Sequence, residues 1–314
     1  MEFRIPFGDW VETGKDWIED NLDWLLEFLG NLWTGLYDAV NWIFATPPAI
    51  AIIIALALAA LLARGWKFAV GAVVGLVFII GVDQWENSMD SLSLVLVAAF
   101  LALLAGIPLG IWAARNQTVS NIVKPIMDFL QTMPAFVYLI PAIAFFGVGV
   151  APGIFATVLF AIAPGVRLTE LGIRSVDQEV VEAGQAFGAS PRRILRQIQL
   201  PLAMPSIMAG VNQVIMLSLS MVVIAGMVGA GGLGGQVTRA VSALDIAIGA
   251  EAGISVVILA ILLDRFTASF GQGMGLYATW AKKRRAKKSD VEQARVDAEH
   301  LEVGHPIRSA GAPS

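Results

Sequence analysis

The chain has 314 residues, of which 57% are hydrophobic and 15% are charged, with a formal net charge of −4 and no cysteine. Soluble domains carry about 25% charged residues, so this composition and a mean hydropathy of +0.72 indicate a polytopic membrane protein. Disulfides and thiolate metal sites are excluded. Both histidines, His300 and His305, lie in the polar tail, which argues against a histidine metal site or proton relay inside the membrane.

The first segment, residues 1–46, is acidic and amphipathic. Its apolar residues recur at steps of three and four, which predicts a helix with one apolar stripe. Trp10, Trp17 and Trp24 repeat every seven residues on a neighbouring line. We expect an external helix that lies on the outer membrane surface or packs as a scaffold against the rest of the protein.

Seven apolar segments follow, each long enough for a bilayer, which needs roughly 20 residues per helix. They run over about 47–63, 66–82, 91–113, 134–150, 152–170, 205–229 and 246–264. The first two make up a region over residues 47–84. Only a short glycine-containing stretch separates the fourth from the fifth, so a re-entrant pair is the alternative there. Acidic and basic residues are missing from the depths of all seven segments, which argues against a proton pathway.

The charged residues between the segments predict an orientation. One side carries Arg64, Lys67, Arg115, Lys124, Arg174, Arg192, Arg193, Arg196 and the basic cluster from Lys282 to Lys288. The other side carries Asp83, Glu86, Asp90 and a single arginine, Arg239. Because basic residues collect on the cytoplasmic side, the N-terminus is expected outside and the C-terminus inside. The segment 271–314 is then a basic anchor followed by a polar cytoplasmic tail.

A charged stretch, EAGQAFGASPRRILRQIQLP at residues 182–201, interrupts the apolar pattern between the fifth and sixth segments. Ser190 followed by Pro191 is typical of a helix start, and Gly188 is the expected break between two short helices. A short helix that projects from the membrane can fit a groove on another protein. The stretch therefore predicts a docking loop.

This stretch resembles the EAA loop of bacterial ABC importer permeases, which docks onto a separate ATPase. The pattern is Glu-Ala-Ala, three residues, Gly, nine residues and Ile-x-Leu-Pro, and it is matched by Glu182, Ala183, Gly188, Ile198, Leu200 and Pro201. Gly184 replaces the second alanine. It is smaller, so we expect docking to persist in a locally weaker helix. The sequence has no GxxxxGK[ST] phosphate loop, so ATP and Mg²⁺ are implied on the partner ATPase and no cofactor is expected on this chain.

Longer stretches resemble one subfamily, the permeases for glycine betaine, proline betaine and related quaternary amines. They are LQTMPAFVYLIPAIAFFGVG (130–149), RLTELGIRSV (167–176) and LSMVVIAGMVGAGGLG (219–234). The resemblance implies an all-α polytopic fold of the type I ABC importer kind, with its core over residues 85–270. It also implies a bacterial inner-membrane location, a second permease copy that completes the pore and an external substrate-binding protein. Nucleic acid is not an expected partner.

Side chains in the fourth and sixth segments are candidates for the substrate path. Phe136 and Tyr138 lie beside prolines that break a helix, and aromatic faces attract quaternary ammonium groups. The sixth segment offers Asn212, Gln213, Met216 and Ser220. Plain packing is the alternative for the aromatic residues, and hydrogen bonding between helices is the alternative for the polar ones.

Two further patterns lie outside the docking loop. The glycine-rich stretch 229–235 lacks the lysine of a nucleotide-binding loop, so we expect a flexible outer gate or a tight re-entrant turn. Arg167, Glu170 and Arg174 stand three or four residues apart, which predicts helix-surface ion pairs near the cytoplasmic boundary.

The leading hypothesis is an ABC importer permease for betaine-type osmolytes, with choline or carnitine as the alternative substrate. An ion-coupled secondary transporter is the alternative from another class, and its uptake would collapse with an ionophore yet survive ATP depletion. A membrane scaffold or receptor is the third possibility, in which the docking loop would bind something other than an ATPase.

Overall fold

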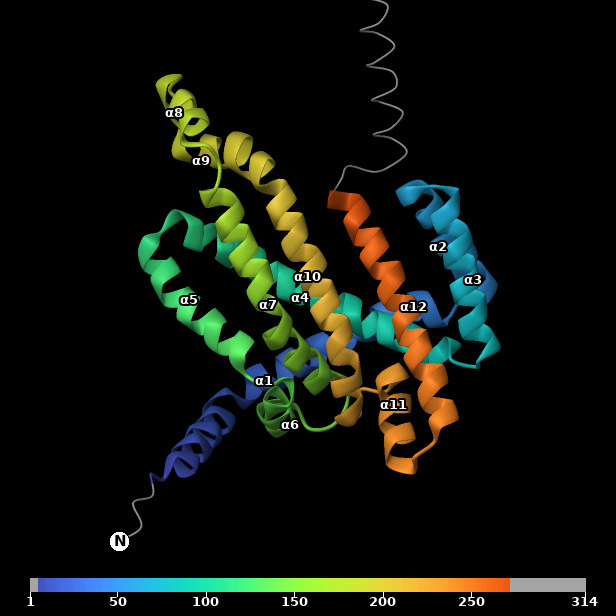
Figure 1. Cartoon of the computed structure of the whole chain (residues 1–314). Helices are drawn as coiled ribbons and strands as arrows, with labels where there is room; N and C mark the ends of the chain where they lie inside the picture. Colours follow the sequence, from blue (N-terminus) through green and yellow to red (C-terminus); the bar gives the residue numbers. More distant parts are fainter. Residues whose placement is uncertain (1–4, 272–314) are drawn as a thin grey trace, which may run out of the picture.

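The computed structural model describes residues 5–271, and every regular element within that range is helical (Figure 1). The elements are α1 (Phe7–Ala45), α2 (Ala49–Arg64), α3 (Trp66–Gly81), α4 (Trp85–Arg115), α5 (Gln117–Thr132), η1 (Ala135–Tyr138), α6 (Leu139–Phe146), α7 (Val150–Arg174), α8 (Gln178–Ala186), α9 (Pro191–Ile194), η2 (Leu195–Gln199), α10 (Leu200–Met227), α11 (Gly232–Ala243) and α12 (Ile246–Gly271). Apart from Gly271, the predicted basic anchor and tail lie outside the described residues.

Within residues 5–271 the chain passes between the two ends of one bundle in α2, α3, α4, α5, α7, α10 and α12 (Figure 1). Side-chain contacts fix the alternating directions. The start of α5 meets the end of α7 through Ser120 and Glu170, and the start of α3 meets the end of α12 through Phe68 and Phe266. By length and composition, four helices in this range can cross a membrane, or up to six spans if each of two bent pairs counts as one, and α3 is a shorter apolar helix.

The fourth predicted span, over 134–150, is wrong. The chain bends by 108° between α5 and the following helices, and Gly147 and Gly149 adopt positive φ values that end the apolar stretch. The fourth pass along the bundle is made instead by α5, which the sequence analysis had left as a connection. Its N-cap is Asn116, whose side chain accepts a hydrogen bond from the backbone N–H of Thr118 at 2.9 Å.

The central helix α7 packs against α4 and α10 at contacts that only glycine permits. A Cβ added to Gly110 of α4 would lie 2.5 Å from the carbonyl oxygen of Val166. A Cβ added to Gly172 of α7 would lie 2.7 Å from the Cβ of Ser206 on α10. Small residues let membrane helices approach closely where burial of apolar surface gives no driving force between them. The core of the bundle is therefore held by backbone proximity.

The amphipathic helix predicted over 1–46 is present as α1. Its C-terminal half packs on the bundle end opposite α8: Trp33 stacks on Phe155 of α7, and Asn41 donates a hydrogen bond to Asp90 of α4. The N-terminal half extends away from the bundle with its repeated tryptophans exposed (Figure 1). Its position on the outer membrane surface stays a prediction.

The two ends of the bundle differ in charge as the sequence predicts. The basic residues at the α2–α3 turn, the α4–α5 turn and the α8–α9 connection gather at one end, and the acidic residues Asp83, Glu86 and Asp90 lie at the other. The glycine-rich stretch at this second end forms a tight turn between α10 and α11. A Cβ on Gly234 would lie 2.0 Å from the carbonyl oxygen of Val222, because α11 folds directly back onto α10.

Candidate coupling loop and substrate path

The predicted docking loop forms a helical hairpin, α8 and α9, that projects from the basic end of the bundle (Figure 1). The side chain of Asp177 caps α8 by accepting a hydrogen bond from the backbone N–H of Glu179 at 2.9 Å. Between the helices Gly188 has a φ of +75°, and hydrogen bonds back to the last turn of α8 close the bend. Pro191 occupies the first position of α9. The predicted arrangement of helix, glycine break and helix is confirmed.

The glycine that departs from the motif, Gly184, is the contact point between the two arms. A Cβ at this position would lie 2.7 Å from Cδ1 of Ile198 and 3.7 Å from Cγ1 of Ile194. Glycine in place of the motif's alanine therefore lets α8 lie close to the second arm of the hairpin, which is formed by α9 and η2. The sequence alone did not show this contact. Two motif positions, Gly184 and Ile198, touch across the hairpin.

The second arm runs without a break into α10 through η2, a π-helical turn. Leu200 and Pro201 are the first residues of α10, and because the helix is continuous here the missing N–H of Pro201 removes one backbone hydrogen bond to the preceding turn. Turns of the π type hold one extra residue and are frequent at functional sites. Any displacement of α9 is consequently passed along a continuous helix into the bundle.

The outer face of the hairpin is open to a partner. Glu182 and Ala183 lie exposed on α8, and Phe187 at the tip is 92% exposed. Covering a phenylalanine side chain fully contributes roughly 1.5–3 kcal/mol, so this ring is the strongest apolar anchor on the tip. The sequence analysis did not identify Phe187 as a contact residue. An aromatic residue directly before the turn glycine was the available signal.

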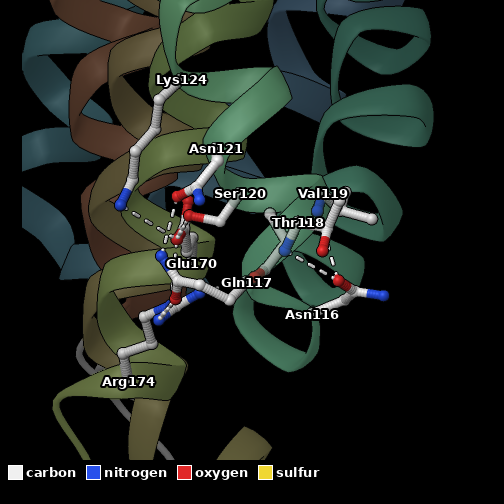
Figure 2. A network of polar contacts seen from close by, with 10 residues as sticks. Asn116, Gln117, Thr118, Val119, Ser120, Asn121, Lys124, Glu170 and Arg174 are labelled. Atoms are coloured by element: carbon white, nitrogen blue, oxygen red, sulfur yellow. Dashed lines mark hydrogen bonds and ion pairs between the residues drawn. The ribbon is translucent and has the colours of Figure 1, made fainter.

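The base of the hairpin, at the end of α7, carries a polar network (Figure 2). Glu170 is 4% exposed, and its Oε1 accepts a hydrogen bond from the Ser120 hydroxyl at 2.7 Å. The same oxygen lies 2.9 Å from Nε of Arg174 and 3.5 Å from Nζ of Lys124. The predicted pair of Glu170 and Arg174 is confirmed, and Arg174 lies on the helix surface as predicted, but Glu170 is buried. Arg167 pairs with α5 instead, because α5 covers this face of α7.

The aromatic path candidates lie in different environments on η1. Phe136 is 55% exposed, whereas Tyr138 is 2% exposed. The Tyr138 hydroxyl donates to the carbonyl of Leu130 at the end of α5, and its ring meets Phe160 of α7 edge to face. This environment fits the packing alternative for Tyr138. Phe136 keeps a free face.

The polar candidates on α10 also lie in two different environments. Asn212 bonds to α12, where its amide donates to Asp264 at 3.3 Å and its oxygen accepts from Thr267. This contact is the predicted alternative of hydrogen bonding between helices. The remaining candidates follow one line on the neighbouring face and are exposed or partly exposed, namely Gln213, Met216 and Ser220. Met221, the residue after Ser220, packs with Tyr138, so the two groups of candidates approach each other there.

Several known proteins are similar to this chain in sequence. The family model described as "Binding-protein-dependent transport system inner membrane component" matches residues 106–275. The glycine betaine/carnitine transport permease protein GbuB of Listeria monocytogenes (serotype 1/2a, strain 10403S) is 47% identical, over 85% of this chain and 96% of the relative. The glycine betaine/proline betaine permease protein ProW of Escherichia coli (strain K12) is 43% identical, over 85% and 76%. The glycine betaine permease protein OpuAB of Bacillus subtilis (strain 168) is 51% identical, over 62% and 69%.

Solved structures share the fold. Two inward-facing structures of the MetNI methionine ABC transporter match with TM-scores of 0.54 and 0.56, at 22% and 20% identity, over 58% and 60% of this chain and 92% and 94% of those chains. At this identity the likeness shows the type I ABC importer fold alone. The family model covers more than half of the chain and agrees with these relatives. The chain therefore belongs to the binding-protein-dependent transport system inner membrane components, the multi-pass permeases that work with an ATPase and a substrate-binding protein.

Proposed function

We propose that this chain is the permease subunit of an ATP-driven importer for glycine betaine- and proline betaine-type compatible solutes. The α8–α9 hairpin is the observation that carries the proposal, because it presents an exposed motif and an aromatic tip at the basic end of a transport-family bundle. ATP and Mg²⁺ belong to the partner ATPase in this scheme, and the permease supplies the path.

The substrate class is supported by the names of the relatives, which are glycine betaine permeases at 43–51% identity. The exposed ring of Phe136 suits the same chemistry, since an aromatic face attracts a quaternary ammonium group by about 0.5–2 kcal/mol. Carnitine is the alternative substrate because the relative from Listeria is named for it as well.

The path itself is proposed to form between two copies of the chain. The line of Gln213, Met216 and Ser220 on α10 is not covered by the single chain and is available to a second copy. Movement would enter through both arms of the hairpin. One arm joins α7 and the other continues into α10, so closure of the ATPases pulls on two neighbouring helices of the bundle.

Co-purification in gentle detergent tests the docking step. The tagged wild-type chain should bring an ATPase subunit with it. Gly188→Pro should lose that subunit, because proline fixes φ near −65° where the turn has +75°. Glu182→Lys should lose it through charge reversal on the exposed face. The matched control is Glu179→Lys, the same charge reversal on the same helix outside the motif.

Uptake in proteoliposomes separates the classes of transporter. ATP-dependent uptake of glycine betaine, inhibited by proline betaine, supports the proposal, and preferential inhibition by carnitine or choline would revise the substrate. A stable complex without any ATPase, together with uptake that an ionophore abolishes, would replace the importer by an ion-coupled transporter.

A further inference from the structure

Three helix ends meet where α7 enters the docking hairpin (Figure 2). They are the C-terminus of α4, the N-terminus of α5 and the C-terminus of α7. Arg174 joins all three: Nη2 donates to the carbonyl of Ala113 in the last turn of α4 at 2.9 Å, and Nη1 donates to Oε1 of Gln117, the first residue of α5, at 2.8 Å. The Ala113 carbonyl is one of the terminal acceptors that a helix leaves without an internal partner.

Glu170 contacts α5 and α7 at the same junction through a hydrogen bond and two ion pairs. Its Oε1 accepts from Ser120 in the first turns of α5 and is paired with Arg174 and with Lys124. A negative group beside a helix N-terminus is favourable, and a buried carboxylate needs ion-pair and hydrogen-bond partners to offset its lost contact with water. The carboxylate therefore attaches α5 to α7 one turn before α7 ends and the chain enters the hairpin.

The attachment of α5 differs from that of the neighbouring helices. α4 and α10 meet α7 at glycine contacts where backbones nearly touch, as at Gly110 and Gly172. α5 meets α7 through an apolar cluster around Val123 and Met127 and through two charged ties, the Glu170 group and the pair of Asp128 with Arg167. The position of α5 is set by polar contacts more than that of any other helix packed on α7 within residues 5–271.

α5 leads from this junction to the bend at the opposite end of the bundle. Its last turn carries the Leu130 carbonyl that accepts from the Tyr138 hydroxyl, and Phe136 lies in the same short helix η1. The 108° bend lies between Leu130, in the last turn of α5, and the η1 residues Phe136 and Tyr138. A displacement of α5 along its axis would move the Leu130 carbonyl, and with it Tyr138 and the helix η1 that also holds Phe136.

We propose that Glu170 is a positioning residue for transport: it ties α5 to the base of the docking hairpin, so that movement of the hairpin carries α5 and the η1–α6 bend with it. The inference rests on the proposed docking of an ATPase at α8 and α9. Glu170 acts through α5, and its removal should separate ATP hydrolysis from transport rather than prevent docking.

The first test replaces Glu170 by glutamine in the assembled complex. Glu170→Gln keeps the shape and an oxygen for Ser120 but removes the charge that holds Arg174 and Lys124. The ATPase should still co-purify and hydrolyse ATP, while betaine uptake per ATP hydrolysed should fall at least about five-fold, within the usual range for residues that carry coupling. The control Glu179→Gln removes an exposed charge from α8 and should change neither quantity. Unchanged uptake per ATP in Glu170→Gln would overturn the proposal.

A distance measurement between α5 and α8 tests whether the two move together while the contacts of Glu170 stay intact. The chain has no cysteine, so spin labels can be placed at Ile122→Cys on α5 and Glu179→Cys on α8 in an otherwise wild-type protein. Their separation should stay constant between the nucleotide-free and ATP-bound complex, while the separation of Glu179→Cys from Leu62→Cys on α2 changes. If the α5–α8 separation changes as much as the α2–α8 separation, α5 is not carried by the hairpin and the inference fails.

Further outcomes separate this inference from the proposed function. A wild-type complex that lacks an ATPase contradicts the docking proposal, whatever the state of Glu170. If Glu170→Gln does not fold, Ser120→Ala removes only the hydrogen bond from α5 and should give a smaller loss of uptake per ATP with hydrolysis intact. In combination with the spin labels, Ser120→Ala should broaden the α5–α8 distance distribution, and an unbroadened distribution with full coupling would contradict the inference.

Discussion

Two glycines of the docking hairpin are under different physical constraints. Gly188 has a φ of +75° and open space around it, so a side chain there meets backbone strain. Gly184 has no such strain, but a Cβ would lie 2.7 Å from the terminal methyl of Ile198. One position is constrained by dihedral angle and the other by room.

Alanine substitution should separate these two constraints. Gly188→Ala should weaken the hairpin by roughly 1–2 kcal/mol, the cost of a left-handed conformation for a residue with a Cβ. Gly184→Ala should be near neutral, because Ile198 can rotate its terminal methyl and alanine gains up to about 1 kcal/mol of helix propensity. Hydrogen exchange of the α8 amides measures both. Equal exchange in the two variants would show that the dihedral angle of Gly188 is not the limiting feature.

The two aromatic residues of η1 should respond in opposite ways. Tyr138→Phe loses the hydrogen bond to Leu130 and should lower stability by about 1 kcal/mol while uptake is kept. Phe136→Ala removes an exposed ring, so thermal stability should hold while the KM for glycine betaine rises. Thermal unfolding in detergent and uptake kinetics provide the comparison. An unaltered KM in Phe136→Ala would remove that residue from the substrate path.

Sequence reasoning located the residues of the docking motif because their spacing along the chain carries the signal. It did not find the contact of Gly184 with Ile198, and it placed Glu170 on a surface. Both facts depend on contacts with another helix. The apolar periodicity of one segment predicts that its helix has a buried face, but not which helix covers that face. The partner of that face comes from the tertiary packing.

At the scale of helices, the long apolar elements α4, α7, α10 and α12 were predicted near their observed positions. α5 was not, because its lysine, aspartate and amide side chains lower its hydropathy. Lys124 and Asp128 pair with α7, and Gln117 and Asn121 lie at the basic end, so the helix needs fewer apolar residues than an isolated span. The apolar stretch after it was mistaken for the span, although its prolines and glycines divide it into short pieces.

The glycine contacts of α7 predict which helix substitutions destabilise the bundle. Gly110→Ala places a methyl group 2.5 Å from the Val166 carbonyl oxygen, where backbone must move, and should cost about 1–3 kcal/mol. Gly71→Ala on α3 is the matched control, since nothing lies within 4 Å of its added Cβ. Thermal unfolding of the detergent-solubilised protein measures the difference. A stability of Gly110→Ala equal to that of Gly71→Ala would mean that α4 and α7 can separate freely.

At the scale of the whole molecule, the charge difference between the two ends predicts the orientation in the membrane. Phe187→Cys on the hairpin tip should react with a membrane-impermeant maleimide only after the cells are opened. Asp9→Cys on the exposed start of α1 should react in intact cells, once the outer envelope is permeable to the reagent. Because the sequence has no cysteine, the wild-type chain is the unlabelled control. Labelling of both sites from the same side would overturn the predicted topology.

The single π turn at Leu195–Gln199 has a consequence for the direction in which the hairpin points. An α-helix advances by about 100° per residue, and the extra residue of a π turn sets the rotational phase between the two helices that it joins. Deleting one residue from this turn would swing Phe187 about the axis of α10 by roughly that angle, while the packing of α10 in the bundle stayed in place. The number of residues in this turn therefore sets the direction in which the hairpin tip points.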